Sequence, residues 1–163
     1  MRARGLWCAV VLSALLHADA ALVEPHRDGD EVVYLTLASQ MRWDFTHYTV
    51  ADVQSPAFRH LRQMNALYRL PRFLHPPLYP TVLKFGNDFV DDAVRFGLLW
   101  QFASMILLLW TARRLSILLA LDAVSECTFY ALLACDPLLL FSTRRLHLDG
   151  LLGIYLFAGV VLC

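Results

Sequence analysis

The chain has 163 residues, of which 58% are hydrophobic, and its mean hydropathy is +0.52. This apolar content exceeds the roughly 45–50% of ordinary soluble domains, so the composition favours a membrane protein. The 14 basic and 14 acidic residues cancel and no basic run is present, so a nucleic-acid partner is not expected.

The first hydrophobic segment covers residues 5–23 and follows a basic start. We interpret this segment as a retained membrane span. A cleaved signal peptide is the alternative, because Ala18-Asp19-Ala20 fits a cleavage site and the mature chain would then begin at Ala21. Apolar character resumes beyond that site through Val23, which favours the retained span.

A long segment, residues 24–95, separates the first span from the next, and its first marked feature is the acidic pair Asp30-Glu31. Residues 28–41 are expected to form a helix, because acidic residues suit its first turn and apolar residues recur at helical spacing. The apolar stripe consists of Val33, Leu37 and Met41, with Tyr34 and Ala38 beside it. Such a helix can lie flat on a membrane surface.

Two proline-containing signals follow in the same long segment. Ser55-Pro56 predicts the start of a second amphipathic helix that continues to about Arg69, with Ser as the cap and Pro at the first helical position. His75-Pro76-Pro77 predicts a rigid, extended element, because a residue before proline avoids the helical region.

Three further hydrophobic stretches are expected to be membrane spans. They cover residues 96–112, 115–135 and 150–163. Asn87 or Asp88 is expected to cap the helix that enters the membrane near Arg95. Asp136-Pro137 interrupts the third span, and the last stretch is shorter than the roughly 20 residues that a span needs. We therefore interpret the chain as the N-terminal part of a longer protein or as a truncated gene model, and we expect the 163-residue fragment itself to be inactive.

Basic residues predict the topology. Arg2 and Arg4 precede the first span, and Arg113-Arg114 are expected to lie in a tight turn between the second and third spans. Three consecutive crossings place both clusters on one side, which the positive-inside rule identifies as cytoplasmic. Residues 24–95 then form a large non-cytoplasmic loop with juxtamembrane helices.

The order of these features resembles the N-terminal part of GT-C glycosyltransferases, especially the protein O-mannosyltransferases and the lipid A aminoarabinose transferases. The shared order is a span, an acidic pair heading a Tyr/Met helix, a Pro-Pro-Leu element, an Arg at the second span and an Arg…Asp loop before the fourth. The resemblance covers nearly all of the chain and implies an all-α integral membrane bundle with a GT-C-like fold, about four of whose spans are present.

The resemblance also implies an activity and a location. Members of this family transfer a sugar from a polyprenyl-phosphate donor to a protein or glycolipid acceptor, on the outer or lumenal face of the membrane. The expected location is therefore a multi-pass position in a bacterial inner membrane or the endoplasmic reticulum, in contact with membrane lipid.

Site residues carry over from the family one by one. Asp30 matches the acidic catalytic position, with Glu31 beside it, and Asp149 matches a second functional carboxylate. The substrate-binding positions are matched by Tyr34, His75, Pro76, Arg95 and Arg145. In this scheme Asp30 accepts the proton of the acceptor hydroxyl, and the cationic side chains stabilise the departing lipid phosphate.

A divalent metal is a further possibility. His26, Asp28, Asp30 and His75 offer imidazole and carboxylate ligands, which suit zinc or manganese. Their spacing matches no compact metal motif, so no metal-ligand set and no cofactor are assigned from the sequence.

Two other functional classes are consistent with the pattern. One is a non-catalytic membrane scaffold that keeps the loop without the remainder of the bundle. The other is a transporter-like or channel subunit, in which Asp122 and Glu126 would handle ions, because they lie at i,i+4 in the predicted third span and acids within membranes usually face a wet interior.

Overall fold

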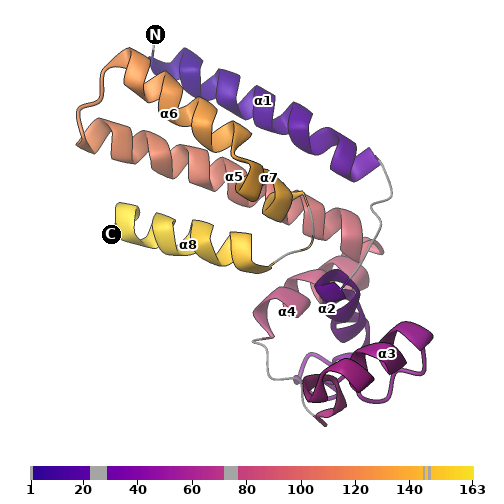
Figure 1. Ribbon diagram of the computed structural model, residues 1–163. Coiled ribbons are helices and arrows are strands. Elements are labelled where there is room, and N and C mark those ends of the chain that lie inside the picture. Colours follow the sequence, from indigo (N-terminus) through magenta and orange to yellow (C-terminus); the bar gives the residue numbers. More distant parts are fainter. Residues whose placement is uncertain (1, 23–28, 72–76, 145, 147) are drawn as a thin grey trace. The chain divides into compact units, whose positions relative to one another are not determined.

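The computed structural model describes residues 2–22, 29–71, 77–144, 146 and 148–163. Every regular element within these residues is a helix, which confirms the expected all-α class. The chain divides into two units, each of which can be followed in Figure 1. The unit that we call the bundle comprises Met1–His26 and Leu98–Cys163, and the unit that we call the insert comprises Arg27–Gly97.

The bundle is built from long apolar helices. They are α1 (Arg2–Leu22), most of α5 (Ala93–Leu118), α6 (Ala123–Cys135), α7 (Pro137–Thr143) and α8 (Leu148–Leu162). Helices α1 and α6 lie side by side (Figure 1). One core cluster joins α1, α5 and α6 through Ala9, Leu109, Ala112, Tyr130 and Ala134. The alanines allow close approach of the helix backbones, as is common in membrane bundles.

Length and composition identify few possible membrane spans. Among the described residues, α5 is the one helix that is long and apolar enough to cross a membrane. Helices α6 and α7 meet at a bend of 49° and count as a second candidate if they form one broken span. The apolar parts of α1 and α8, Gly5–Ala18 and Leu151–Leu162, are shorter than the 18 residues that a candidate span needs. The multi-pass arrangement with four spans stays a prediction.

Helix α5 continues through the point at which the sequence predicted a turn. Arg113 and Arg114 lie inside the helix, and the chain turns only at residues 119–122, where Ala120 has a φ of 51°. Arginine is a good helix former, so an arginine pair does not end a helix. Helix α6 is instead started by Asp122, whose carboxylate accepts two backbone N–H bonds. The predicted turn was wrong, as was the inclusion of Asp122 within a span.

The insert packs short helices around the apolar stripe of its first helix. The elements are α2 (Gly29–Gln40), α3 (Pro56–Met64), η1 (Ala66–Arg69), α4 (Leu78–Phe85), η2 (Gly86–Val90) and the first turn of α5. The stripe residues Val33, Leu37 and Met41 are at most 1% exposed, and α2 packs against α4. The expected helix is present, but its stripe faces the interior of the insert and is therefore not available to a membrane surface.

Proline and asparagine divide the middle of the insert as local rules require. Ser55 caps α3 by accepting a bond from the amide of Phe58 at 3.3 Å, and Pro56 is the first helical residue, as predicted. The helix does not continue to Arg69. Asn65 is extended (φ −140°, ψ 124°) and its side chain starts the separate helix η1 instead. Asparagine competes for backbone amides in this way, which breaks a helix.

The start of α5 differs from the sequence prediction. Asn87 and Asp88 both lie in η2, and neither caps α5. Asp91 follows in the left-handed region, with a φ of 59°, and reverses the chain. Asp92 then supplies the cap, because its carboxylate accepts a bond from the amide of Arg95 at 2.9 Å.

Candidate functional site

The acidic pair of the insert lies in the first turn of α2, where the helix dipole favours negative charge. Asp30 is exposed, whereas Glu31 is only 1% exposed. Consecutive residues of a helix point about 100° apart, so one carboxylate can face solvent while its neighbour faces the interior. The two predicted catalytic acids therefore occupy different environments.

Two buried tyrosines lie behind this turn. Tyr34 and Tyr79 are 5% and 1% exposed, and their rings meet edge to face with centroids 5.5 Å apart. This geometry is the favourable one for a pair of aromatic quadrupoles. Because Tyr34 belongs to the second turn of α2 and Tyr79 to the first turn of α4, the contact holds these two turns against each other.

Two more tyrosines of the insert have raised pKa values. Burial raises the pKa of Tyr48 to about 12, with a smaller contribution from Tyr34. Burial also raises the pKa of Tyr68, and the negative charge of Asp30 adds to that rise. Both phenols therefore stay protonated at neutral pH and are able to donate hydrogen bonds.

Backbone contacts hold the loop that carries Tyr48. The guanidinium of Arg62 donates to the carbonyl oxygens of Val50 and Val53, at 3.1 and 2.8 Å. The hydroxyl of Thr49 donates to the carbonyl of Leu70 at 2.8 Å. These bonds tie the loop after α2 to α3 and η1, so the tyrosines are held by a scaffold rather than by a free loop.

Arg95, predicted to bind a lipid phosphate, lies in the first turn of α5. Its side chain is 77% exposed and its Nε lies 3.3 Å from the carboxylate of Asp92. Exposed ion pairs of this kind contribute little stability, so the guanidinium is able to exchange Asp92 for another anion. No hydrogen bond or ion pair between described residues joins Arg95 to Asp30.

The remaining predicted residues are only partly described. His75, Pro76 and Arg145 lie outside the described residues. Asp149 lies in the first turn of α8, in the bundle, and its side chain is also outside the description. Of the predicted site, the structure therefore brings together Asp30, Glu31 and Tyr34 on α2.

Most of the possible metal ligands also lie outside the described residues. His26, Asp28 and His75 lie outside it, which leaves Asp30 alone of the four. Among the residues that are described, no group of three or more His, Cys, Asp or Glu side chains could hold a metal ion. A divalent metal stays a prediction.

A second polar cluster lies inside the bundle and involves one of the acids assigned to ion handling. Glu126 is 2% exposed and accepts a hydrogen bond from the hydroxyl of Tyr130 at 2.5 Å, and the hydroxyl of Ser116 lies 3.3 Å from the same oxygen. Asp122 is exposed and serves as the cap of α6. Both acids make structural contacts, and the transporter-like alternative stays a prediction.

Two of these arrangements had no recognisable sequence pattern. Tyr68 is far from Asp30 in the chain, and only the folding of the insert lets the charge of Asp30 affect this phenol. His17 is buried in the bundle, and its Nε2 lies 2.7 Å from the hydroxyl of Thr143. Tyr79 could have been found from the sequence, because it directly follows the Pro-Pro-Leu element.

No protein-family model, curated protein or solved structure matches this chain. Arguments about its function therefore depend on the residues themselves and on the geometry of the insert.

Proposed function

We propose that the chain belongs to a multi-pass membrane glycosyltransferase with a GT-C-like fold. In this proposal the protein transfers a sugar from a polyprenyl-phosphate donor to a protein or lipid acceptor on the non-cytoplasmic face. Asp30 is the general base, and Arg95, Arg145 and His75 have the role of binding the donor phosphate.

One observation carries this proposal. Asp30 is an exposed carboxylate on a helix whose opposite face is buried, so its backbone is fixed while its side chain is free to meet a substrate. A base that removes a proton from an acceptor hydroxyl needs this combination of rigid support and access. An acidic residue at a helix start commonly has a structural role. Here Glu31 is the carboxylate that is packed into the insert, whereas Asp30 is left open to a substrate.

Besides a base, the transfer reaction requires groups that stabilise the departing phosphate. A polyprenyl-phosphate sugar already carries a good leaving group at the anomeric carbon. The acceptor oxygen forms the new bond to that carbon as the bond to the phosphate oxygen breaks, and the acceptor proton passes to Asp30. The lipid phosphate leaves as an anion, which exposed guanidinium groups such as Arg95 stabilise by charge-assisted hydrogen bonds.

Asp30→Asn provides the test. Membranes containing the full-length protein are given radiolabelled mannosyl phosphopolyprenol, and transfer to protein and lipid fractions is measured together with retention of the donor. Asparagine is nearly isosteric but accepts no proton, so transfer is expected to fall by about 10²–10⁴-fold while donor binding persists.

Asp52→Asn is the matched control, because Asp52 is also an exposed carboxylate of the insert. Transfer by this variant is expected to equal that of the unaltered protein. Equal transfer by Asp30→Asn and the unaltered protein would remove Asp30 from the mechanism. Absence of both donor binding and transfer in the unaltered full-length protein would refute the activity and leave the non-catalytic scaffold and the transporter-like subunit.

A further inference from the structure

Four aromatic rings form a continuous row at the end of the insert, and we call this row the aromatic ridge. Its members are Trp43, Phe85, Phe89 and Phe96. The ring centroids of Trp43 and Phe89 are 6.0 Å apart, those of Phe89 and Phe85 4.6 Å, and those of Phe85 and Phe96 5.5 Å. The row therefore connects the loop after α2, the helix α4 with its extension η2, and the first turn of α5.

The ridge exposes much of its apolar surface. Trp43 is 46% exposed, Phe85 44% and Phe89 67%, and the neighbouring Val90 is 52% exposed. Single exposed apolar residues are normal on proteins, but a contiguous group of rings indicates a surface that is covered by something else.

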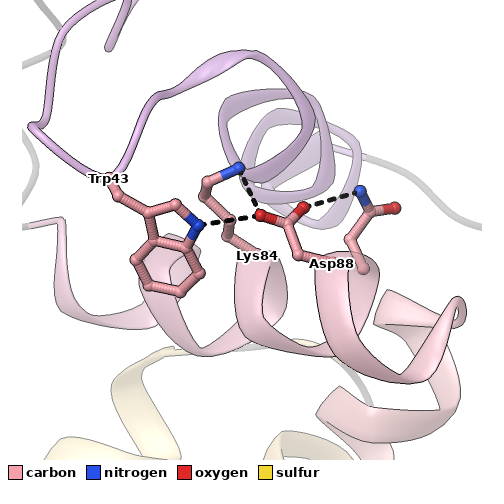
Figure 2. Close-up of polar contacts among 4 residues, drawn as sticks. Trp43, Lys84 and Asp88 are labelled. Atoms are coloured by element: carbon pink, nitrogen blue, oxygen red, sulfur yellow. Dashed lines mark hydrogen bonds and ion pairs between the residues drawn. The ribbon is translucent and has the colours of Figure 1, made fainter.

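Polar contacts hold Trp43 in place within the ridge. Its indole N–H donates to the carboxylate of Asp88 at 2.9 Å, and the ammonium of Lys84 pairs with the same oxygen at 2.8 Å (Figure 2). The ammonium also lies 5.4 Å from the centre of the indole ring, a cation–π distance. The ring therefore has a fixed orientation, with its polar edge bonded and the rest of its surface partly open.

We propose that the aromatic ridge is embedded in the interfacial layer of a lipid bilayer, at the end of α5 that begins with Ala93. Phe96 belongs both to the ridge and to the first turn of α5, the helix that is long and apolar enough to span. The ridge is thus continuous with the point at which that helix leaves the membrane. Tryptophan and other amphipathic rings gather at this depth, because one edge is apolar and the other is hydrogen-bonded.

Charge around the ridge selects the type of lipid surface. Lys84 is neutralised by Asp88, and the adjoining segments carry the acids Asp44, Asp91 and Asp92 together with Arg42 and Arg95. Three carboxylates against two guanidinium groups leave no net positive charge, so the surface lacks the cluster of Lys and Arg that anionic headgroups recruit. Burial of aromatic surface therefore drives the contact, and it requires neither anionic lipid nor low salt.

Fluorescence of Trp43 tests this placement. The variant Trp7→Phe/Trp100→Phe/Trp110→Phe keeps Trp43 as its one tryptophan, and the chain is reconstituted in phosphatidylcholine vesicles. The lipids carry bromine either near the headgroup or near the chain ends. Shallow bromine is expected to quench Trp43 more than deep bromine, aqueous iodide is expected to quench it weakly, and added phosphatidylglycerol is expected to change neither result.

Two controls separate this inference from the proposed function, with which it shares the premise that α5 crosses the membrane. A second variant keeps only Trp100, which lies about 10 Å along α5 from Ala93. Its fluorescence is expected to be quenched best by bromine placed deeper in the bilayer than the bromine that best quenches Trp43. Phe89→Ala is expected to reduce shallow quenching of Trp43, whereas Met64→Ala is not, because Met64 is 73% exposed on α3 and outside the ridge.

Strong iodide quenching of Trp43 without bromine quenching would overturn the inference, since the ridge would then face water or a protein partner. Greater quenching by deep than by shallow bromine would overturn it too, as would a requirement for phosphatidylglycerol. If Trp100 is quenched by bromine and Trp43 is not, the ridge alone is refuted. If neither is quenched, the span itself fails, and with it the proposed membrane enzyme.

Discussion

Replacing Gly86 with alanine tests how closely the end of α4 approaches the start of α5. A Cβ atom built on Gly86 lies 2.6 Å from the Cβ of Phe96 and 2.8 Å from its Cγ. Carbon atoms in ordinary contact are about 3.5–4.0 Å apart, so Phe96 must retreat by about 1 Å. The nearest atom is a Cβ, which is fixed to the backbone, so a change of rotamer does not relieve the clash.

The magnitude follows from two opposing effects. Overpacking of this kind costs about 1–3 kcal/mol. Gly86 has helical backbone angles (φ −57°, ψ −42°), so alanine also gains up to about 1 kcal/mol of helix propensity. The expected net change in the free energy of local unfolding is a loss of about 0–2 kcal/mol. Gly153→Ala in α8 is the matched control, because no atom lies within 4 Å of its built Cβ. It is expected to gain about 0.5–1 kcal/mol.

Hydrogen exchange read by mass spectrometry measures both changes locally. Amides of α4 and η2 are expected to exchange up to about 30-fold faster in Gly86→Ala, and amides of α8 about 2- to 5-fold slower in Gly153→Ala. Adding Phe96→Ala to Gly86→Ala leaves the closest contact in place and is not expected to restore protection. Slower exchange in Gly86→Ala, matching that in Gly153→Ala, would refute the close approach of Gly86 and Phe96.

Two further predictions concern a helix cap and a buried phenol. Asp122→Ala removes the acceptor for the first amides of α6 and is expected to cost about 1 kcal/mol of helix stability, whereas Asp122→Asn keeps the cap. Hydrogen exchange of the α6 amides measures both variants. Equal losses of protection in the two would contradict the capping role. The pKa of Tyr48 is about 12 in the folded protein against an ordinary 10.0, so its contribution to stability is present below pH 10 and is lost as the pH rises to 12. A phenolate absorbance titration compared with that of Tyr48→Phe follows this change, and ionisation of Tyr48 together with exposed tyrosines would contradict it.

Local signals in the sequence predicted several elements correctly. Ser55-Pro56 starts α3, Asp136-Pro137 separates α6 from α7, and the acidic pair heads α2. Each of these depends on the backbone of a few adjacent residues, where a side-chain oxygen accepts an N–H bond or a proline lacks one. The place of Asp30 at a helix start is a local property of the same kind, whereas its assignment as a base came from the family resemblance.

Tertiary packing decided the features that connect distant residues. The stripe of Val33, Leu37 and Met41 is compatible with a membrane surface or with a protein core, and only the packing of α2 against α4 assigns it to the core. Likewise, Asp88 reads as a helix cap in the sequence, but in the fold it binds Trp43 and Lys84. Periodicity determines which residues share a face, whereas what covers that face depends on contacts between segments that the local pattern does not encode.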